Sequence, residues 1–426
     1  MTICVHGLGF VGLATASLFA NNDREVIGFD PDDELIGKLE FGEPEVGESD
    51  FEAYIQDALD GSLTPSRQPE PADYHLICVP TPYDDNEEQA DLSYIRSSAQ
   101  NISGILQEGD TVVVESTVPP GTTVEVVQPI LSNMSTINGD AFGLGYTPET
   151  IMPGNTLTEL RNNDRIIGGI DDRSTAAIRE LYEPILGGEV HAAPDPTTAE
   201  FAKLAQNAAR DVEIAYANTL SLVAAEYNID SRSAIDLANN HPRVNILDPG
   251  PGVGGHCLPV DPLFLCDGSD ETVLIETARD INNRMPRHII RLLKREVGVL
   301  DDKTVAVLGI TYKGNVSDTR NSPGLEIARL VDNRKEATPQ LTDGGRDSCS
   351  VAIHDPRATD STLNLVSLEE AIEGADAVIF GAAHTEFADI DPSWIAEKLD
   401  GQTVIDPVNA IDESYWADNS LEVISI

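Results

Sequence analysis

The feature that most constrains the fold is a glycine-rich turn close to the N-terminus. The turn reads Gly7-Leu8-Gly9-Phe10-Val11-Gly12. It follows an apolar run typical of a strand and precedes a run typical of a helix, and Asp30 ends the next apolar run, 18 residues after Gly12. Glycines at this spacing allow a tight turn and close approach to a pyrophosphate, while the acid can bind ribose hydroxyls. The pattern predicts a dinucleotide-binding βαβ unit, and a glycine-tolerant turn without a ligand is the alternative.

The residues after Asp30 favour one dinucleotide over another. Pro31, Asp32, Asp33 and Glu34 follow it, with no arginine among them. Because these acids would repel a 2′-phosphate, NAD is favoured over NADP as the cofactor.

The order of apolar runs predicts the domain organisation. Strand and helix patterns alternate in the first third and again after Asp301, whereas the strand signal disappears from about Thr197 to Arg295. The run from Thr198 to Ile229 is free of Gly and Pro and long enough for a helix of about 45 Å. We expect an α/β protein with two Rossmann-like parallel-sheet domains joined by a helical middle domain. The predicted boundaries are 1–195 for an NAD-binding domain, 196–298 for a central helical domain and 299–426 for a second Rossmann-like domain, with a polar loop from Thr338 to Ser350.

Composition excludes several classes of partner. The 426 residues carry 27 Lys and Arg against 73 Asp and Glu, a net charge of −46. A chain of this charge repels nucleic acid and anionic lipid, so neither is expected as a partner. The acids are spread along the whole length, and the hypothesis we draw is adaptation to a salt-rich cytoplasm; an acidic protein from a mesophile is the alternative.

Cysteine usage and hydropathy indicate a cytoplasmic protein without a metal site. The five cysteines are odd in number and scattered, which argues against a disulfide scaffold or zinc centre. They are Cys4, Cys78, Cys257, Cys266 and Cys349. No run approaches the ~18 apolar residues of a membrane span, and the apolar N-terminus lacks the basic region of a signal peptide.

One cysteine stands in a segment of unusual composition. Four glycines precede it in Gly250-Pro251-Gly252-Val253-Gly254-Gly255-His256-Cys257, and Asp261 follows four residues later. A backbone this open can wrap a ligand and leave the thiol reachable, and a thiolate can attack a carbonyl carbon. His256 could lower the pKa of that thiol. The alternative is a buried free cysteine beside a flexible turn, which is our interpretation of the other four.

Polar residues elsewhere form weaker candidates. Lys203, Asn207 and Arg210 share one stripe of the predicted long helix and could hold an oxyanion, or form an ordinary solvated stripe. Pro80-Thr81 and the segment containing Thr117 follow strands, where a parallel sheet presents ligand-contacting loops; plain turn chemistry is the alternative.

The third predicted domain opens with a different loop. Its first turn, Gly309 to Asn315, lacks a second GxGxxG, so a second dinucleotide site is not expected. Lys313 and Arg320 suit a ligand with fewer or differently placed phosphates, unless they are ordinary surface charges.

Taken together these segments resemble the nucleotide-sugar 6-dehydrogenases over nearly the whole chain. The motifs are STVPPGT, EFAKLAQNAARDVEIAYAN, NNHPRVNILDPG, GPGVGGHCLPVDP and YKGNVSDTRNSP. The cysteine loop and the NNHPRVNILDPG segment are most similar to the branch that acts on UDP-N-acetylmannosamine and UDP-N-acetylglucosamine.

The resemblance implies a reaction and a set of roles. The C6 alcohol of a UDP-sugar is oxidised twice, consuming two NAD, through a thiohemiacetal and a thioester on Cys257. Lys203 and Asn207 would stabilise the oxyanions, Asp261 would position a water, and Glu149 would be the base for hydrolysis. The resemblance also implies contacts with the substrate from Thr117, Arg210, Gly254, His256 and Lys313. Contacts with the cofactor would come from Pro80, Thr81, Thr117 and Arg320. The resemblance further implies a homodimer paired through the central helix, in which Arg243 would reach the sugar of the neighbouring subunit.

One departure from the branch leaves the substrate open. Thr150 follows Glu149 where the branch usually has arginine, which puts the sugar epimer and the acetamido group in question. The leading hypothesis is a UDP-N-acetylhexosamine dehydrogenase that supplies surface polysaccharide or glycan synthesis. The alternatives are a UDP-glucose dehydrogenase, a simple two-electron dehydrogenase and a non-catalytic nucleotide-sugar binding protein.

Overall fold

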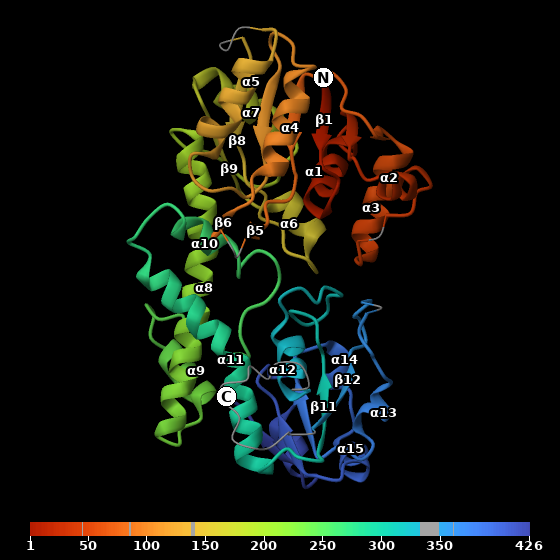
Figure 1. Ribbon diagram of the computed structural model, residues 1–426, viewed down its shortest axis with the longest axis vertical. Helices are drawn as coiled ribbons and strands as arrows, with labels where there is room; N and C mark the ends of the chain where they lie inside the picture. The colour runs from red at the N-terminus through yellow and green to blue at the C-terminus, as the bar shows by residue number, and fades with distance from the viewer. Residues whose placement is uncertain (45, 85–86, 138–140, 333–348, 361) are drawn as a thin grey trace. The chain divides into compact units, whose positions relative to one another are not determined.

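The computed structural model (Figure 1) describes residues 1–44, 46–84, 87–137, 141–332, 349–360 and 362–426. It divides into a first unit, 1–206 with 263–270, and a second unit, 207–262 with 271–426, and each is described by itself. The polar loop predicted from Thr338 to Ser350 lies outside the described residues as far as residue 348, and Ser350 already begins a strand.

The first unit is built on one large sheet. Its strands follow the order β10-β9-β8-β7-β4-β1-β2-β3, and neighbouring strands are parallel except β8 and β9. Their bounds are β1 (Thr2–His6), β2 (Glu25–Phe29), β3 (Leu63–Ser66), β4 (Tyr74–Ile77), β7 (Thr111–Val114), β8 (Gly143–Tyr146), β9 (Arg165–Gly169) and β10 (Val190–Ala192). Because the strand order reverses at β1, the carboxyl end of β1 is a topological switch point, where such sheets bind ligands.

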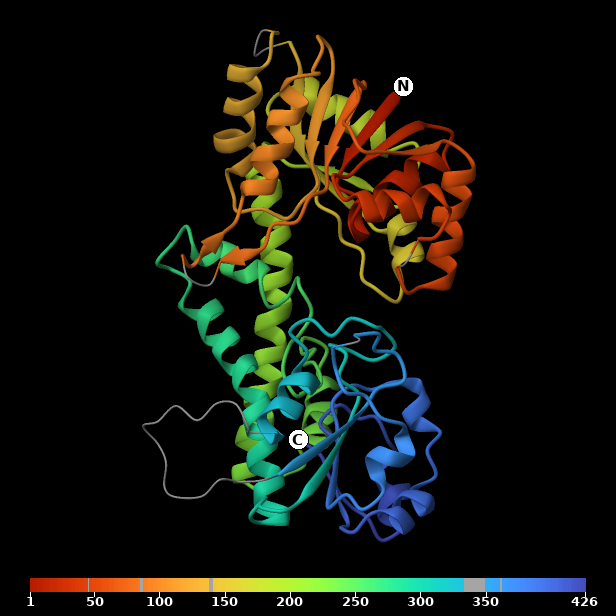
Figure 2. The same cartoon turned by 45° about the vertical axis from the view of Figure 1, so that its right-hand side comes forward.

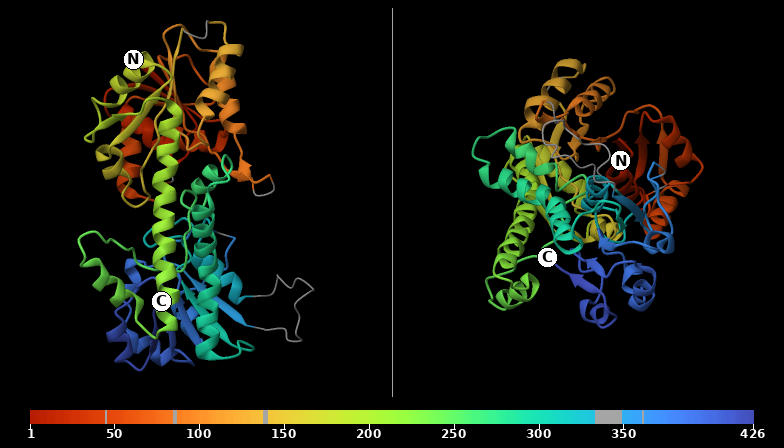
Figure 3. Two further views of the ribbon diagram at one scale, coloured as in Figure 1. Left: turned by 90° about the vertical axis from the view of Figure 1, so that its left-hand side faces the viewer. Right: turned by 60° about the horizontal axis from the view of Figure 1, so that its bottom comes forward.

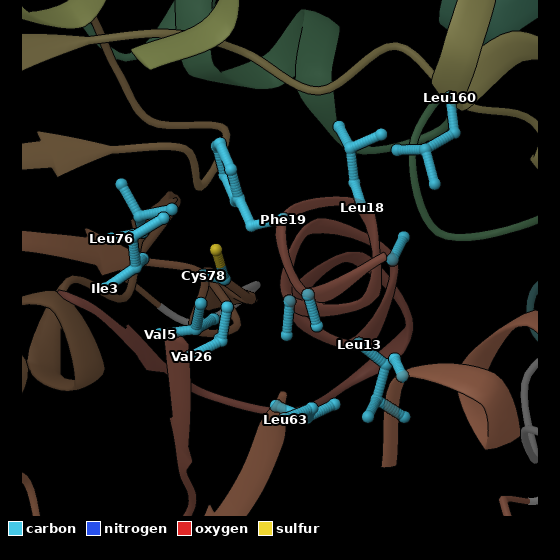
Figure 4. Close-up of a cluster of buried hydrophobic side chains, with 14 of the residues drawn as sticks. Ile3, Val5, Leu13, Leu18, Phe19, Val26, Leu63, Leu76, Cys78 and Leu160 are labelled. Carbon is cyan, nitrogen blue, oxygen red and sulfur yellow. The ribbon is translucent and has the colours of Figure 1, made fainter. Parts of the chain in front are cut away.

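Helices cover both faces of this sheet. They are α1 (Phe10–Ala20), α2 (Asp33–Glu40), α3 (Ser49–Asp60), α4 (Ser93–Ser103), the π-helical turn η1 (Thr123–Val127), α5 (Gln128–Met134), α6 (Thr156–Asn162) and α7 (Asp172–Tyr182). A two-stranded ribbon, β5 (Tyr83–Asp84) with β6 (Gln89–Ala90), lies outside the sheet. Figure 4 shows Phe19 of α1 on the side of Ile3 and Leu76 of the sheet, whereas Leu18 of α1 lies toward Leu160 of α6. Strands buried on both faces explain the continuous apolar runs of the sequence.

The long helix predicted from the run without Gly and Pro is α8 (Pro196–Glu226), which has 31 residues. At 1.5 Å per residue its length is about 46 Å. Figure 3 shows it as one unbroken helix, and the boundary between the two units falls within it, after Gln206.

The second unit combines helices with a smaller sheet (Figure 2). The sheet is parallel throughout, in the order β12-β11-β13-β14-β15. Its strands are β11 (Thr304–Leu308), β12 (Ser350–His354), β13 (Ala377–Phe380), β14 (Thr403–Ile405) and β15 (Glu422–Ile424). The remaining helices are α9 (Ser231–Asn239), α10 (Asp261–Cys266), α11 (Val273–Val297), α12 (Pro323–Val331), α13 (Leu368–Ile372), α14 (Thr385–Ala388), α15 (Pro392–Lys398) and α16 (Glu413–Ala417), of which α10 ends within the first unit.

Buried polar contacts hold α11 against the second part of α8. Arg279 Nη1 lies 2.5 Å from Asp211 Oδ1, and Asn218 Nδ2 donates to Asn282 Oδ1 at 2.9 Å. Breaking a buried ion pair of this kind typically costs about 3–5 kcal/mol.

The predicted fold class is confirmed: two Rossmann-like parallel-sheet domains with a helical region between them. The three domain boundaries stay a prediction. Among the described residues, no helix combines the length and apolar character needed to cross a membrane.

Candidate active site

The glycine turn stands at the carboxyl end of β1, where the sheet reverses its strand order. Gly7 N donates to Phe29 O at 2.8 Å, and Leu8 N donates to Asp30 Oδ2 at 2.8 Å. A Cβ added at Gly12 would lie 1.8 Å from Gly7 O, so α1 packs against the turn as only glycine allows. The predicted glycines and Asp30 are therefore brought together by these short contacts.

The start of α1 is open to a ligand. Gly9 is its N-cap and, within the described residues, no side chain caps the helix or places an acid in its first turn. A Cβ built on Gly9 would meet no described atom within 4 Å. Uncapped amides and the helix dipole favour an anion here, and half-buried Asp30 flanks the turn. These residues fit a dinucleotide, with pyrophosphate at the helix start and ribose at Asp30.

The two predicted loops after β4 and β7 are tied to each other. Thr81 Oγ1 donates to Thr117 O at 2.6 Å, and Ser116 Oγ donates to Val79 O at 2.7 Å. Pro80 is exposed, whereas Thr81 and Thr117 are half-buried. The two loops thus lie together at the carboxyl edge of the sheet, and their contact with a ligand stays a prediction.

A buried carboxylate that the sequence analysis missed anchors this surface to α8. Glu200 accepts hydrogen bonds from Gly121 N at 2.6 Å and from Thr123 N at 2.8 Å. Burial raises the pKa of Glu200 to about 7 despite these hydrogen bonds. In the sequence it stands three positions before Lys203 on α8, and no motif marks it.

Glu149, the candidate base, lies in a buried polar network of the first unit. Its Oε2 pairs with Arg165 Nη2, and its Oε1 accepts from Thr150 N at 2.7 Å. Arg165 also lies 3.5 Å from Glu115 Oε1 and stacks over the ring of Tyr182. Burial raises the pKa of Glu115, against the charge of Arg165. As arranged here Glu149 is paired with Arg165, so acting as a base requires it to change partner.

Arg165 had no recognisable signal in the sequence, and Glu115 was marked only as part of the polar segment that contains Thr117. Glu115 stands 50 positions from Arg165, and Glu149 stands 16 from it. Only the neighbouring strand ends bring the three side chains together.

In the second unit, the cysteine loop is held against the loop that joins β11 to α12. Gly255 N donates to Arg320 O at 2.9 Å, and Asn321 Nδ2 donates to Gly255 O at 2.9 Å. A Cβ on Gly254 would come within 2.7 Å of Asn321 O, which explains the glycine there. The loop is fixed, yet Cys257 is exposed, in contrast to Cys4, Cys78 and Cys349, which are buried, and Cys266, which is partly buried.

Two further predicted residues meet beside this cysteine. Asn207 Nδ2 donates to Asp261 Oδ2 at 2.5 Å, and Asp261 N donates to Cys257 O at 2.8 Å. Buried Asp261 therefore orients the Asn207 amide and continues the backbone turn that begins at Cys257. Lys203 is buried one helical turn before Asn207 on α8.

Arg210, the last member of the predicted stripe, is exposed and lies 3.6 Å from Glu213 Oε2. It lines a cavity of about 480 Å³ together with Asp236, Asn239, Asp248 and Gly252. Arg243 is exposed in the segment after α9.

The charges near Cys257 differ from those expected. Burial, followed by the charge of Arg320, lowers the pKa of His256, so its imidazole is neutral near pH 7 and supplies no positive charge to the thiol. Arg320 is held by Asp318 at 2.6 Å, and its pKa is raised chiefly by that hydrogen bond and also by the charge of Cys257. Arg320 is therefore the cation in this group that can stabilise a thiolate. Lys313 is half-buried in the same loop, where its carbonyl accepts from Thr311 Oγ1 at 2.9 Å.

Comparison with protein families matches three parts of the chain. Residues 1–186 match the NAD binding domain of the UDP-glucose/GDP-mannose dehydrogenase family, 197–284 match its central domain and 306–413 match its UDP binding domain.

Individual relatives cover nearly the full length. A UDP-N-acetyl-D-mannosamine dehydrogenase of Methanococcus aeolicus is 39% identical over 99% of this chain and 94% of its own. An NDP-N-acetyl-D-galactosaminuronic acid dehydrogenase of Ralstonia nicotianae is 36% identical over 95% of each. The solved structure of a UDP-D-ManNAc dehydrogenase from Pyrococcus horikoshii superposes with a TM-score of 0.90 at 34% identity, covering 100% of this chain and 99% of that one.

Proposed function

The chain belongs to the UDP-glucose/GDP-mannose dehydrogenase family, and we propose that it oxidises the C6 alcohol of a UDP-N-acetylhexosamine, most of all UDP-N-acetyl-D-mannosamine, to the uronate. The observation that carries this proposal is the exposed thiol of Cys257 on a loop whose backbone is otherwise fixed. A dehydrogenase that stopped at an aldehyde would have no use for such a thiol.

The reaction removes four electrons in two steps. NAD held at the turn from Gly7 to Gly12 and at Asp30 would supply the hydride acceptor for each oxidation. In the first, the C6 alcohol loses a hydride and a proton and becomes an aldehyde. The Cys257 thiolate then adds to the aldehyde carbon, and the resulting thiohemiacetal loses a second hydride and a proton to become a thioester. Water adds to the thioester carbon, the C–S bond breaks, and the carboxylate leaves while Cys257 is restored.

The polar residues assigned to the reaction suit the charges that develop at C6. Asn207, oriented by Asp261, and Lys203 on the same helix would donate to the oxyanion of each tetrahedral species. Asp261 would position the water, and Thr117 would contact substrate or water. Glu149 would become the hydrolytic base on leaving Arg165. Lys313 would contact the uridine diphosphate.

The sugar is the least constrained part of the proposal. Thr150 occupies the place of an arginine and donates its backbone N–H to Glu149. We retain UDP-N-acetyl-D-glucosamine and UDP-glucose as alternative substrates. The Ralstonia relative adds an N-acetylgalactosamine derivative as a third.

The first test is the number of NADH formed per nucleotide sugar. Each candidate sugar is supplied in limiting amount, in molar salt, and NADH is followed by absorbance while the product is identified by mass spectrometry. Two NADH and a uronate from one sugar are expected. One NADH with free aldehyde would reduce the protein to a two-electron dehydrogenase, and NAD binding without turnover of any sugar would make it a binding protein.

A cysteine variant tests the covalent steps. Cys257→Ser should lower uronate formation by at least about 10³-fold, because the variant lacks the nucleophile that carries the aldehyde to the acid. Cys266→Ser, nine residues away and outside the glycine loop, is the matched control and should retain activity. Full uronate production by Cys257→Ser would contradict the relay.

We also propose a homodimer paired through the central helices. Exposed apolar side chains line a groove of about 320 Å³ in the second unit. They include Tyr216 and Val223 of α8, and Tyr227 and Ile229 of the turn that joins α8 to α9. An apolar face of this kind is typical of a subunit interface. In the homodimer, Arg243 would reach the sugar of the neighbouring subunit. Tyr227→Asp should shift the mass measured by light scattering toward that of the monomer. Tyr94 is an exposed tyrosine of the first unit, and Tyr94→Asp should leave the mass unchanged.

The thiol of Cys257 and the acidic charge of the chain suggest the cellular compartment and its salt concentration. An exposed Cys257 must stay reduced to act, which favours the cytoplasm, where the uronate would supply polysaccharide synthesis. With a net charge of −46, self-repulsion should weaken the fold in dilute buffer. We expect the thermal unfolding midpoint to rise from dilute buffer to molar KCl; full stability in dilute buffer would contradict adaptation to salt.

A further inference from the structure

Three metal-ligating side chains meet inside the first unit, away from the residues assigned above. Cys4 and His6 lie two positions apart on β1 and therefore share a face of the sheet. The register pairs Cys4 with His75 on the neighbouring parallel strand β4. This face is opposite to the one on which Ile3 and Val5 pack against α1. Cys4, His6 and His75 are all completely buried.

The two histidines of this group lie at the spacing of metal ligands, and the cysteine lies close to them. The Cys4 sulfur and one ring nitrogen from each histidine lie within 4.8 Å of one another. His6 Nε2 and His75 Nδ1 are 3.2 Å apart. Two imidazole nitrogens on one tetrahedral zinc ion are about 3.3–3.4 Å apart, given bonds of about 2.0–2.1 Å. The histidines are therefore already at ligand spacing, and a small rotation of the Cys4 side chain would complete a three-residue site.

The contact between the two rings uses one nitrogen of each and, in the part of the chain that the structure describes, leaves the opposite nitrogen of each ring without a partner. Among the described residues, His6 Nδ1 and His75 Nε2 are buried and have no hydrogen-bond partner. Leaving such an atom unpaired typically costs about 1–3 kcal/mol. A single hydrogen bond between the two rings is thus a poor reason for two histidines in the interior of a parallel sheet.

A nearby carboxylate completes the chemistry. His75 Nε2 lies 4.0 Å from Asp110 Oδ2. With an ion on Nδ1, the Nε2 of His75 carries the proton and faces this carboxylate, an arrangement common at histidine-ligated metals. The Cys4 thiolate and the Asp110 carboxylate together balance the charge of a divalent cation.

We propose that Cys4, His6 and His75 bind one divalent ion of the zinc class, separately from Cys257. Thiolate and imidazole select Zn²⁺ or Co²⁺ over Mg²⁺ and Ca²⁺, which prefer oxygen. Binding displaces the proton of the Cys4 thiol to solvent and leaves both histidines neutral. The ion joins β1 to β4 immediately before the glycine turn, since His6 precedes Gly7. Because all three side chains are fully buried, the ion must bind as the chain folds.

The strand register explains why the sequence did not indicate this site. Cys4 and His75 are 71 positions apart and no CxxC or HxxxH spacing marks them. The scattered cysteines predicted no metal, whereas pairing of β1 with β4 places one of them against two histidines.

The test is metal content after folding with zinc. Wild type and Cys257→Ser are purified from cells grown with added zinc, and also refolded in molar KCl with excess Zn²⁺, then desalted and measured by plasma mass spectrometry. About one zinc per chain is expected in both proteins. Cys4→Ser and the double variant His6→Val/His75→Val should hold none, and His191→Ala, an exposed histidine of the same domain, should hold as much as wild type.

Spectroscopy and measurements of stability identify the metal-binding residues without an activity assay. Co²⁺-refolded protein should show thiolate-to-cobalt absorption that disappears in Cys4→Ser and persists in Cys257→Ser. Adding a chelator during refolding should lower the unfolding midpoint of wild type. The double variant, in which apolar strand residues replace both rings, should fold and show no response to metal.

Two results would overturn the proposal. One is loss of the bound zinc, or of the cobalt absorption band, in Cys257→Ser, which would place the ion on the cysteine loop. The other is a wild-type chain that folds with excess zinc and holds none, in which case the two rings are simply a hydrogen-bonded pair.

Discussion

The two Rossmann-like domains begin with the same hydrogen-bonded turn. In the first, Gly7 N donates to Phe29 O and Leu8 N to Asp30 Oδ2, both at 2.8 Å. In the second, Gly309 N donates to His354 O at 2.8 Å, and Ile310 N donates to the carboxylate that follows β12 at 2.6 Å. That carboxylate is Asp355, the positional equivalent of Asp30.

The two turns differ in what occupies them. Asp355 also accepts from Arg357 N and Ala358 N, lies 3.1 Å from His384 Nε2, and has a fully buried side chain. The helix that follows, α12, is capped by Ser322. Asp30 is half-buried, and α1 has no side-chain cap among the described residues. The same turn is closed by protein groups in one domain and left to a dinucleotide in the other, so an acid after the second strand does not by itself indicate a nucleotide site.

The largest effects should come from the glycines that let each helix approach its turn. In Gly12→Ala the new Cβ would lie 1.8 Å from Gly7 O, and in Gly324→Ala 2.5 Å from Gly309 O. Overpacking should cost each variant about 1–3 kcal/mol of unfolding free energy. Gly12→Ala should also lower kcat/KM for NAD by at least about 100-fold, because the displaced turn no longer fits the pyrophosphate.

Calorimetric titration with NAD checks this contrast. Gly324→Ala should bind NAD with nearly wild-type affinity at a temperature where it is folded. Equal losses of NAD affinity in both variants would mean that the second turn also takes part in dinucleotide binding.

A second contrast concerns buried carboxylates with several hydrogen-bond donors. In the first domain, burial raises the pKa of Glu200 to about 7. The folded protein keeps this proton to a higher pH than the unfolded chain does. The contribution of Glu200 to the free energy of unfolding is therefore greatest below about pH 4.5 and declines up to pH 7. The free energy of unfolding should fall by about 3 kcal/mol across that window. Chemical unfolding of wild type and Glu200→Gln at several pH values measures it, and the variant should lack this decline; identical slopes would show that Glu200 does not titrate there.

Asp355 should behave in the opposite sense. Burial alone would raise its pKa, but hydrogen bonds from His384 and backbone amides outweigh burial and lower the pKa to about 2. Its contribution is therefore complete above about pH 4 and is lost as pH falls toward 2, by about 2 kcal/mol. Acid unfolding of Asp355→Asn should be shallower than that of wild type in this range. If Asp355→Asn lost stability between about pH 4 and pH 2 as steeply as wild type, Asp355 would not differ from Glu200 in this way.

The smallest effect should come from Asp30. Asp30→Asn keeps an acceptor for Leu8 N but loses the charge facing the ribose, so NAD affinity should fall about 10-fold, or about 1.4 kcal/mol, with little change in stability. The preference for NAD over NADP should narrow as well. Asp33→Asn, an exposed acid at the start of α2, is the control for surface charge, and an equal loss of affinity there would mean that the general acidic field, and not the ribose contact, sets the affinity.

The most predictable parts of this protein are those written in consecutive residues. The glycine turn, the long helix α8 and the glycine-rich segment before Cys257 follow from local sequence, because helix periodicity and tight turns depend on residues a few positions apart. The resemblance that these motifs carry led to the family that the comparisons show.

Other features were decided by the tertiary structure. The pairing of Glu149 with Arg165, the burial of Asp355 against His384 and the meeting of Cys4 and His6 with His75 all join residues that are distant in sequence. Such contacts depend on strand order and register, which a sequence pattern does not encode locally. Whether a carboxylate binds a ligand, accepts from its own backbone or pairs with a buried arginine is set by the side chains that packing places around it. The sequence by itself thus determined where the main helices and strands form and which cysteine stands in a glycine-rich loop, whereas only packing decided the partner and protonation of each buried charge.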